Sequence, residues 1–131
     1  MAKKNKIEKD NESLPTKDEV KMFEILYPMI EGDLEEIREL SKKKQDEPLN
    51  KFKVEIINKK LEKAKSILKN EPTIEFLELL DKETLPTNSD AVLQITQFIN
   101  ALNNFRNKFY VKKGGIDFGL DVPYHEWETE K

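Results

Sequence analysis

The chain of 131 residues contains no cysteine, one histidine, one tryptophan and four glycines. The absence of cysteine excludes a disulfide scaffold, a thiolate metal site and a cysteine nucleophile. No run of about 18 apolar residues exists, so the sequence predicts no membrane span. The first residues, MAKKNKIEKDNES, lack the apolar core of a signal peptide. We therefore expect a soluble, cytoplasmic protein that does not bind a membrane.

Arginine is also scarce, since only Arg38 and Arg106 occur among the 23 basic residues, and 26 acidic residues give a net charge of −3. Arginine is the preferred residue for bidentate contacts to phosphates and base edges. A globally basic nucleic-acid binder is therefore not expected. A local excess of lysine remains in residues 42–70, which carry ten lysines against four acids.

Apolar residues recur at three- and four-residue spacing through most of the chain, which predicts an all-α fold. We expect a bundle of three long helices and one short helix. Capping boxes, proline and glycine place the ends of these helices. The predicted helices run from a Thr16–Glu19 capping box to about Lys44, from 46–48 to about Asn70, over 74–81, and from a cap at Asn88 or Ser89 to Val111.

The ends of the chain differ from this bundle. Residues 1–15 are polar and are expected to form a disordered arm, and residues 16–111 to form the helical bundle domain. Residues 112–131 alternate apolar and polar positions, as strands do, but no partner strand is expected in this chain. We expect an extended tail that packs on the bundle, or alternatively on a partner.

Two acidic motifs are the candidates for metal chemistry. Glu35, Glu36 and Glu39 spell EExxE, and Glu78 with Asp81 spells ExxD. These motifs resemble those of the all-α nucleotide pyrophosphatases, which implies carboxylates that bind Mg²⁺ and a nucleotide. On a helical wheel, however, these residues lie opposite the apolar side, whereas metal ligands in a bundle point inward. We therefore expect a solvated acidic surface, with no metal and no cofactor.

Lys53 and Lys60 lie between two apolar stripes of the second helix. Contacts on both sides would shield them partly from water, so that each needs a carboxylate or another anion nearby. Three interpretations remain open. The lysine stems cover apolar surface while the ammonium groups reach solvent, the lysines pair with the acidic first helix, or they bind phosphate or a nucleic-acid backbone.

The last helix carries the most informative pattern. From Ala91 to Phe105 there is no charged residue, although 37% of the chain is charged. Its polar side consists largely of amides, including asparagine, a poor helix former. Uncharged amides suit a covered surface, where a bare charge would be costly. The predicted partner-binding residues are Gln94, Gln97, Asn100, Asn104 and Arg106, with Phe118, Tyr124 and Trp127 in the tail.

The sequence thus favours a non-enzymatic helical interaction protein, such as a small regulatory or accessory subunit. It would form homo-oligomers, bind another protein, or both. No catalytic residue is assigned, and the lone His125 is expected on the surface. The alternatives are a Mg²⁺-dependent nucleotide pyrophosphatase using the acidic motifs, and a nucleic-acid accessory protein using the lysines of residues 42–70.

Overall fold

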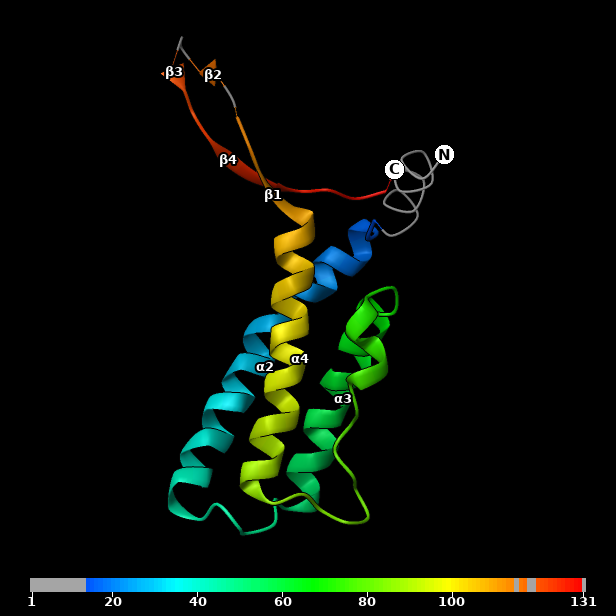
Figure 1. The fold of residues 1–131 in the computed structure, drawn as a ribbon, viewed down its shortest axis with the longest axis vertical. Coiled ribbons are helices and arrows are strands. Elements are labelled where there is room, and N and C mark those ends of the chain that lie inside the picture. Colours follow the sequence, from blue (N-terminus) through cyan, green and yellow to red (C-terminus); the bar gives the residue numbers. More distant parts are fainter. Residues whose placement is uncertain (1–13, 115, 118–119, 131) are drawn as a thin grey trace.

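The computed structural model describes residues 14–114, 116–117 and 120–130. Its long helices are α2 (Lys17–Lys43), α3 (Lys51–Ile67) and α4 (Asn88–Phe109), and a short 3₁₀ helix, η1 (Pro72–Phe76), follows α3. Helices α3 and α4 both run antiparallel to α2 (Figure 1). Helix α2 packs against each of them, whereas α3 and α4 contact one another little. The predicted predominantly helical fold is confirmed.

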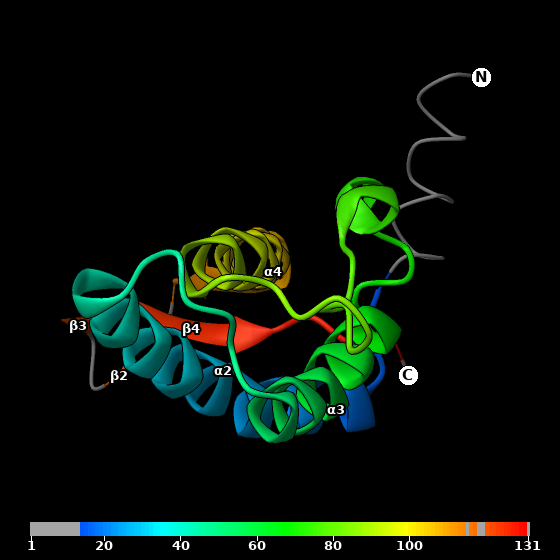
Figure 2. The ribbon, with the colours of Figure 1, turned by 90° about the horizontal axis from the view of Figure 1, so that it is seen from below.

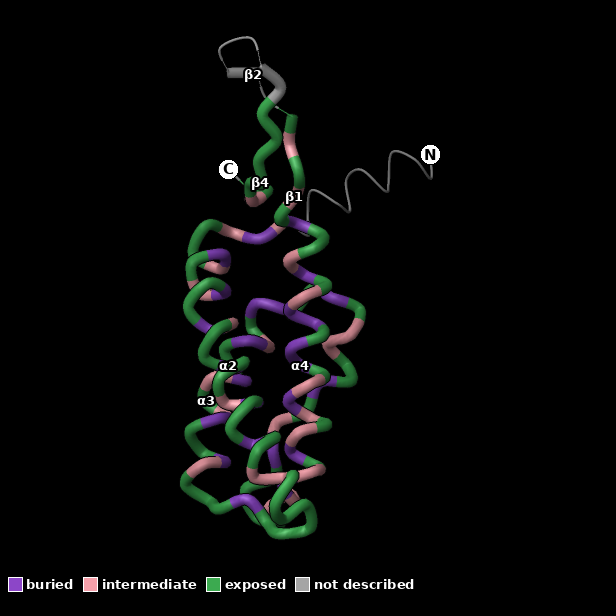
Figure 3. Tube along the Cα trace, turned by 90° about the vertical axis from the view of Figure 1, so that its left-hand side faces the viewer, coloured by how far each residue is buried: buried purple, intermediate pink, exposed green. Residues whose placement is uncertain are grey.

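Figure 2 shows α2, α3 and α4 from one end of the molecule, and Figure 3 marks the buried residues that each of them carries. The buried apolar residues of the three helices form one shared core. Ile30 and Ile37 on α2, Leu61 on α3, and Phe98 and Leu102 on α4 are fully buried. Burial of each such side chain contributes about 1.5–3 kcal/mol relative to exposure. The three- and four-residue spacing seen in the sequence therefore locates most of the core. Phe52 and Ile56 on α3 share this spacing but are 70% and 36% exposed, so the expectation that both apolar stripes of the second helix are covered is wrong for this part of one stripe.

The capping box at the start of α2 is present as predicted. The Thr16 hydroxyl accepts a hydrogen bond from the Glu19 amide at 3.0 Å, and the Glu19 carboxylate accepts one from the Thr16 amide at 2.9 Å. Leu14 and Pro15, which the sequence placed in the disordered arm, belong to the folded part. Leu14 packs against the core, and Pro15 is buried. The rest of the predicted arm lies outside the described residues.

The predicted start of α3 at residues 46–48 is wrong. The helix begins after Asn50, whose side chain accepts a hydrogen bond from the Lys53 amide at 2.8 Å. Before it, the Leu49 amide donates to the Pro86 carbonyl at 2.8 Å, and Pro48 forms an isolated antiparallel bridge with Thr87. These contacts with a distant segment hold residues 48–49 outside the helix.

The start of α4 also differs from the prediction. Thr87 is the N-cap, and its hydroxyl accepts a hydrogen bond from the Asp90 amide at 3.1 Å. Asn88 is buried instead, and its side chain donates to the Lys44 carbonyl at 2.9 Å, which ties the end of α2 to the start of α4. At its other end α4 stops at Phe109, before the predicted Val111.

The short helix predicted over 74–81 is wrong in position and type. Only Pro72–Phe76 is helical, and the chain then continues without regular structure. The side-chain amide of Asn58 on α3 bonds both backbone groups of Leu80. Leu77 and Leu80 are both buried. Tertiary contacts have thus overridden a local helical pattern.

The tail forms a hairpin, which corrects the expectation of an extended segment without a partner strand. Strand β1 (Tyr110–Lys113) pairs antiparallel with β4 (Tyr124–Trp127), and β2 (Ile116–Asp117) pairs with β3 (Leu120–Asp121). The hairpin projects from the end of α4 (Figure 1). Beyond β4 the chain returns to the start of α2, where the Glu130 amide donates to the Pro15 carbonyl at 2.9 Å.

Candidate functional site

The five amides in the uncharged stretch of α4, residues 91–105, fall into two groups, and the chain itself covers the first. The half-buried Gln94 donates to the Leu79 carbonyl at 3.4 Å. Asn103 accepts from the Tyr27 hydroxyl at 2.7 Å and from the Arg106 guanidinium at 3.3 Å. These two amides therefore have partners within the monomer, on α2, on α4 and in the segment after η1.

The second group is exposed. Gln97, Asn100 and Asn104 lie with Leu93 along one side of α4, spaced four, three and four residues apart. This spacing aligns side chains on a helix surface and is the spacing of a coiled-coil seam. Leu93 is 60% exposed. We call these four residues the amide stripe. Three of the predicted partner-binding residues thus share one open surface.

Phe76 stands beside the amide stripe and was not singled out from the sequence. Phe76 is the last residue of η1 and is 67% exposed. A shallow pocket of about 260 Å³ separates it from α4, lined also by Thr73, Leu77, Gln97, Asn100, Ala101 and Asn104. An exposed aromatic side chain next to uncharged residues is typical of protein interfaces.

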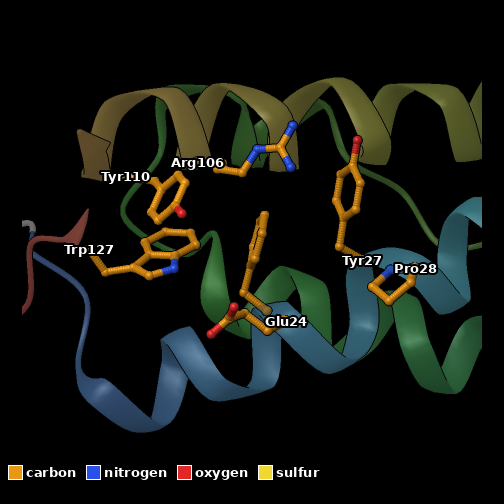
Figure 4. Close-up of a pocket in the computed structure, with 7 residues that line it drawn as sticks. Glu24, Tyr27, Pro28, Arg106, Tyr110 and Trp127 are labelled. Carbon is orange, nitrogen blue, oxygen red and sulfur yellow. The ribbon is translucent and has the colours of Figure 1, made fainter. Parts of the chain in front are cut away.

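Two other predicted residues, Arg106 and Trp127, come together in a second pocket, also of about 260 Å³. This aromatic pocket lies between α2, α4 and the base of the hairpin (Figure 4). The other lining residues could not be recognised from the sequence as pocket residues, because Tyr27 falls among the apolar positions of α2 and Glu24 is one of many acids. The pocket is completed by Phe23, Glu24, Tyr27 and Pro28 from α2 and by Tyr110 from β1.

Trp127 docks the hairpin on the chain's own bundle. Its ring centroid lies 5.2 Å from that of Phe23, 5.2 Å from that of Tyr110 and 6.0 Å from that of Phe105. The side chain is half-buried and packs against the core. This part of the tail therefore lies on the bundle, as the sequence favoured, and only the remaining exposed part of the indole can face a ligand.

Arg106 is held in place without an acidic partner. Its guanidinium carbon lies 5.1 Å from the centroid of the Tyr27 ring, a cation–π arrangement. Among the described residues, no carboxylate lies within 4.0 Å of the guanidinium. Arg106 is half-buried. A partly desolvated cation with unused hydrogen-bond donors thus forms one side of the aromatic pocket.

The other tail residues lie further along the hairpin. Tyr124 is 46% exposed at the start of β4. His125 is exposed, and its ring stacks on that of Tyr110 at 5.2 Å. Phe118 lies outside the described residues. Of the predicted tail residues that the structure describes, Tyr124 and Trp127, neither shares a site with the amide stripe.

Lys60 has a partner within the bundle. Its ammonium lies 2.8 Å from the Asp33 carboxylate on α2, and the two side chains are only 17% and 20% exposed. This is the pairing with the acidic first helix that the sequence left open as one interpretation. Lys53, about two turns earlier on α3, is half-buried. Because Asp33 already neutralises Lys60, anion binding by the two lysines gains no support from the geometry.

The carboxylates of the EExxE motif lie on the outer side of α2. Glu35 pairs with Arg38 at 3.7 Å, and Glu39 pairs with Lys42 at 3.0 Å. Glu36 is exposed as well. Both ion pairs are local contacts along one turn of the helix, as expected for a solvated charged surface.

The carboxylates of the ExxD motif are not on a helix. Glu78 is exposed, and Asp81 accepts hydrogen bonds from the Glu83 and Thr84 amides at 2.8 and 3.0 Å. The bonds from Thr84 and then Glu83 hold the pKa of the Asp81 carboxyl below its usual value. Within the described parts of the chain, no three or more such side chains are grouped to hold a metal ion. The resemblance to the pyrophosphatases therefore finds no geometric support.

Comparison of the chain with protein-family models, with curated proteins and with solved structures found no match. Of the helices in residues 14–114, none has the length and apolar character required to cross a bilayer. The residues of the amide stripe and of the aromatic pocket are therefore the basis for a functional argument.

Proposed function

We propose that this protein is a non-enzymatic helical interaction module that self-associates through the amide stripe of α4. The observation that carries the proposal is an exposed helix surface without charge in a chain that is 37% charged. Solvated helix surfaces normally carry Glu and Lys, which favour helix and pair along it. A surface that becomes covered instead favours groups whose hydrogen bonds can be satisfied and that carry no charge.

A second copy of the chain fits this surface because the surface is complementary to itself. Every side-chain amide both donates and accepts, so an amide stripe can bond the same stripe across a two-fold axis. No like charges meet when identical uncharged surfaces come together. Phe76 adds an exposed aromatic anchor beside a shallow pocket. In the proposed dimer, each Phe76 ring packs against the pocket of the other copy.

The expected dimer is weak and specific. The amide stripe contains one leucine, Leu93, and three amides, so it buries little apolar surface. Asparagine at a seam position of paired helices fixes their register and oligomeric state at a cost in stability. We therefore expect reversible association that depends on protein concentration.

Sedimentation velocity on the whole chain, from about 1 µM to about 1 mM, tests this proposal. Gln97→Glu and Asn104→Glu each place a negative charge on the stripe of both copies, and each should weaken association by about tenfold or more. Gln45→Glu makes the same change at an exposed position in the loop after α2, and should leave association unchanged.

Charge reversal gives a sharper test. If the stripe meets itself, a mixture of Gln97→Lys and Gln97→Glu should associate more strongly than either variant alone, because opposite charges then face each other. A wild-type chain that stays monomeric over the whole concentration range would contradict self-association. A dimer that none of these charges disturbs would place the contact elsewhere.

A further inference from the structure

The aromatic pocket is the second feature of the molecule that indicates binding, and it is separate from the amide stripe. Its volume of about 260 Å³ lies just below the roughly 300–1,000 Å³ of pockets that hold drug-sized ligands. Three elements build it: α2 and α4 form opposite sides, and the base of the hairpin closes one end (Figure 4). A single amino-acid residue matches this size.

The α4 side of the pocket offers a cation. Within the described part of the chain, the Arg106 guanidinium makes one side-chain hydrogen bond, to Asn103 at 3.3 Å, and is held over the Tyr27 ring. A guanidinium has five N–H donors in a planar fork, and a carboxylate accepts two of them at once. Since the described residues supply no carboxylate within 4.0 Å, the group that best satisfies Arg106 is a carboxylate from a ligand.

The α2 side offers acceptors. Glu24 is exposed at the pocket and comes from the helix opposite Arg106 (Figure 4). Pro28 has no amide hydrogen, so the backbone carbonyl of Glu24 lacks the donor that a helix normally provides four residues later. A ligand that fits here presents an N–H group toward α2. Glu24 repels a second carboxylate at this side.

The rest of the lining is aromatic. Phe23 and Tyr27 stack with centroids 5.5 Å apart, and Trp127 meets Phe23 edge to face at 5.2 Å. These rings hold one another in place, so the pocket is formed before any ligand arrives. An apolar side chain that enters it is transferred from water onto a ready apolar surface.

We propose that the aromatic pocket binds an apolar amino-acid residue with a free α-carboxylate. The carboxylate pairs with Arg106, the side chain lies against the rings, and the N–H group faces Glu24. The carboxyl-terminal residue of a peptide has this chemistry, and so does a free apolar amino acid. The proposal does not depend on self-association.

Calorimetric titration of the whole chain with three probes tests the proposal and separates the two sources. The probes are a five-residue Gly/Ser peptide ending in Phe with a free carboxylate, the same peptide with an amidated end, and free phenylalanine. The free-acid peptide should bind about tenfold or more tightly than the amide, because the amide cannot form the charged pair. Tighter binding of the peptide than of phenylalanine identifies a chain end as the ligand, and the reverse identifies the free amino acid.

Variants assign the effect to Arg106. Arg106→Gln should lower the affinity for the free-acid probe to that of the amide, and Arg106→Lys should weaken binding because ammonium lacks the planar fork. Arg38→Gln removes the other arginine of the chain, on the outer side of α2, and should change nothing. Circular dichroism verifies that each variant is folded. Three results would overturn the proposal. They are equal binding of the free-acid and amidated peptides, binding of neither the free-acid peptide nor phenylalanine at about 1 mM, and an Arg106→Gln variant that binds the free-acid probe as the wild type does.

Discussion

The side-chain amide of Asn58 bonds both backbone groups of Leu80, donating to its carbonyl at 2.8 Å and accepting from its amide at 2.9 Å. Asn58 lies on α3, and Leu80 lies in the irregular segment after η1. The asparagine thus supplies the two hydrogen bonds that a helix would otherwise provide to Leu80. This relationship fixes the segment that connects η1 to α4 against the bundle.

Replacing Asn58 therefore tests what holds this segment. Asn58→Ala leaves both backbone groups of Leu80 without a partner, and should lower the free energy of unfolding by about 1–3 kcal/mol. Urea unfolding followed by circular dichroism measures the change. Asn70→Ala, at an exposed position after α3, is the control and should stay within about 0.5 kcal/mol of the wild type. Equal stability of the two variants would contradict this role of Asn58.

The Lys60–Asp33 pair gives a second stability prediction. Both side chains are less than one quarter exposed, and they join α3 to α2 at 2.8 Å. Lys60→Met leaves the Asp33 carboxylate unpaired and should cost about 1–3 kcal/mol. Adding Asp33→Leu should recover much of that loss, because an apolar pair removes the unpaired charge. The same urea experiment measures both variants.

The exposed ion pair of Lys42 and Glu39 is the control for the Lys60→Met prediction. Their charged groups are 3.0 Å apart, but the side chains are 71% and 56% exposed. Lys42→Met should therefore cost less than about 1 kcal/mol. If Lys60→Met costs no more than Lys42→Met, or if the double variant is less stable than the single one, the pair does not act as described.

We expect the hairpin to be held on the helical bundle by only one of its two faces, the face that carries Trp127. Trp127 packs on Phe23, whereas Tyr124, three residues earlier on the same strand, points to the other face and is 46% exposed. Trp127→Ala should lower the free energy of unfolding by about 2 kcal/mol, which is below the range for fully buried aromatic residues. It should also speed hydrogen exchange of the β1 amides. Tyr124→Ala should do neither, and a similar effect of both variants would contradict the docking.

The helices could be predicted because the buried side of each one follows from the spacing of apolar residues along the sequence. Phe23, Ile30 and Leu34 recur along α2, and all are buried. The errors lie where distant residues decide the backbone. Leu49 and Pro86 are far apart in the sequence, yet their hydrogen bond helps to delay the start of α3. No local pattern contains such a contact.

The candidate sites show the same division. The uncharged stretch of α4 is visible in the sequence, but only the packing shows that Asn103 is bonded to Tyr27 while Asn104 is exposed. Arg106 and Trp127 were predicted as separate contact residues. That they line one pocket with Glu24 follows from the packing of α2, α4 and the hairpin, which residue spacing does not specify.

Asp81 provides a prediction of pH dependence. Hydrogen bonds from the Thr84 and Glu83 amides hold the pKa of the Asp81 carboxyl below its usual value. The stability that these bonds give the loop is therefore fully present above the pKa of unfolded aspartate, about 3.9. It is lost as the pH falls through the lower pKa of the folded state. NMR titration should therefore show the Glu83 and Thr84 amides shifting with a midpoint below that value. Asp81→Asn should abolish this acid shift, and a midpoint at or above the usual value would contradict the assigned bonds.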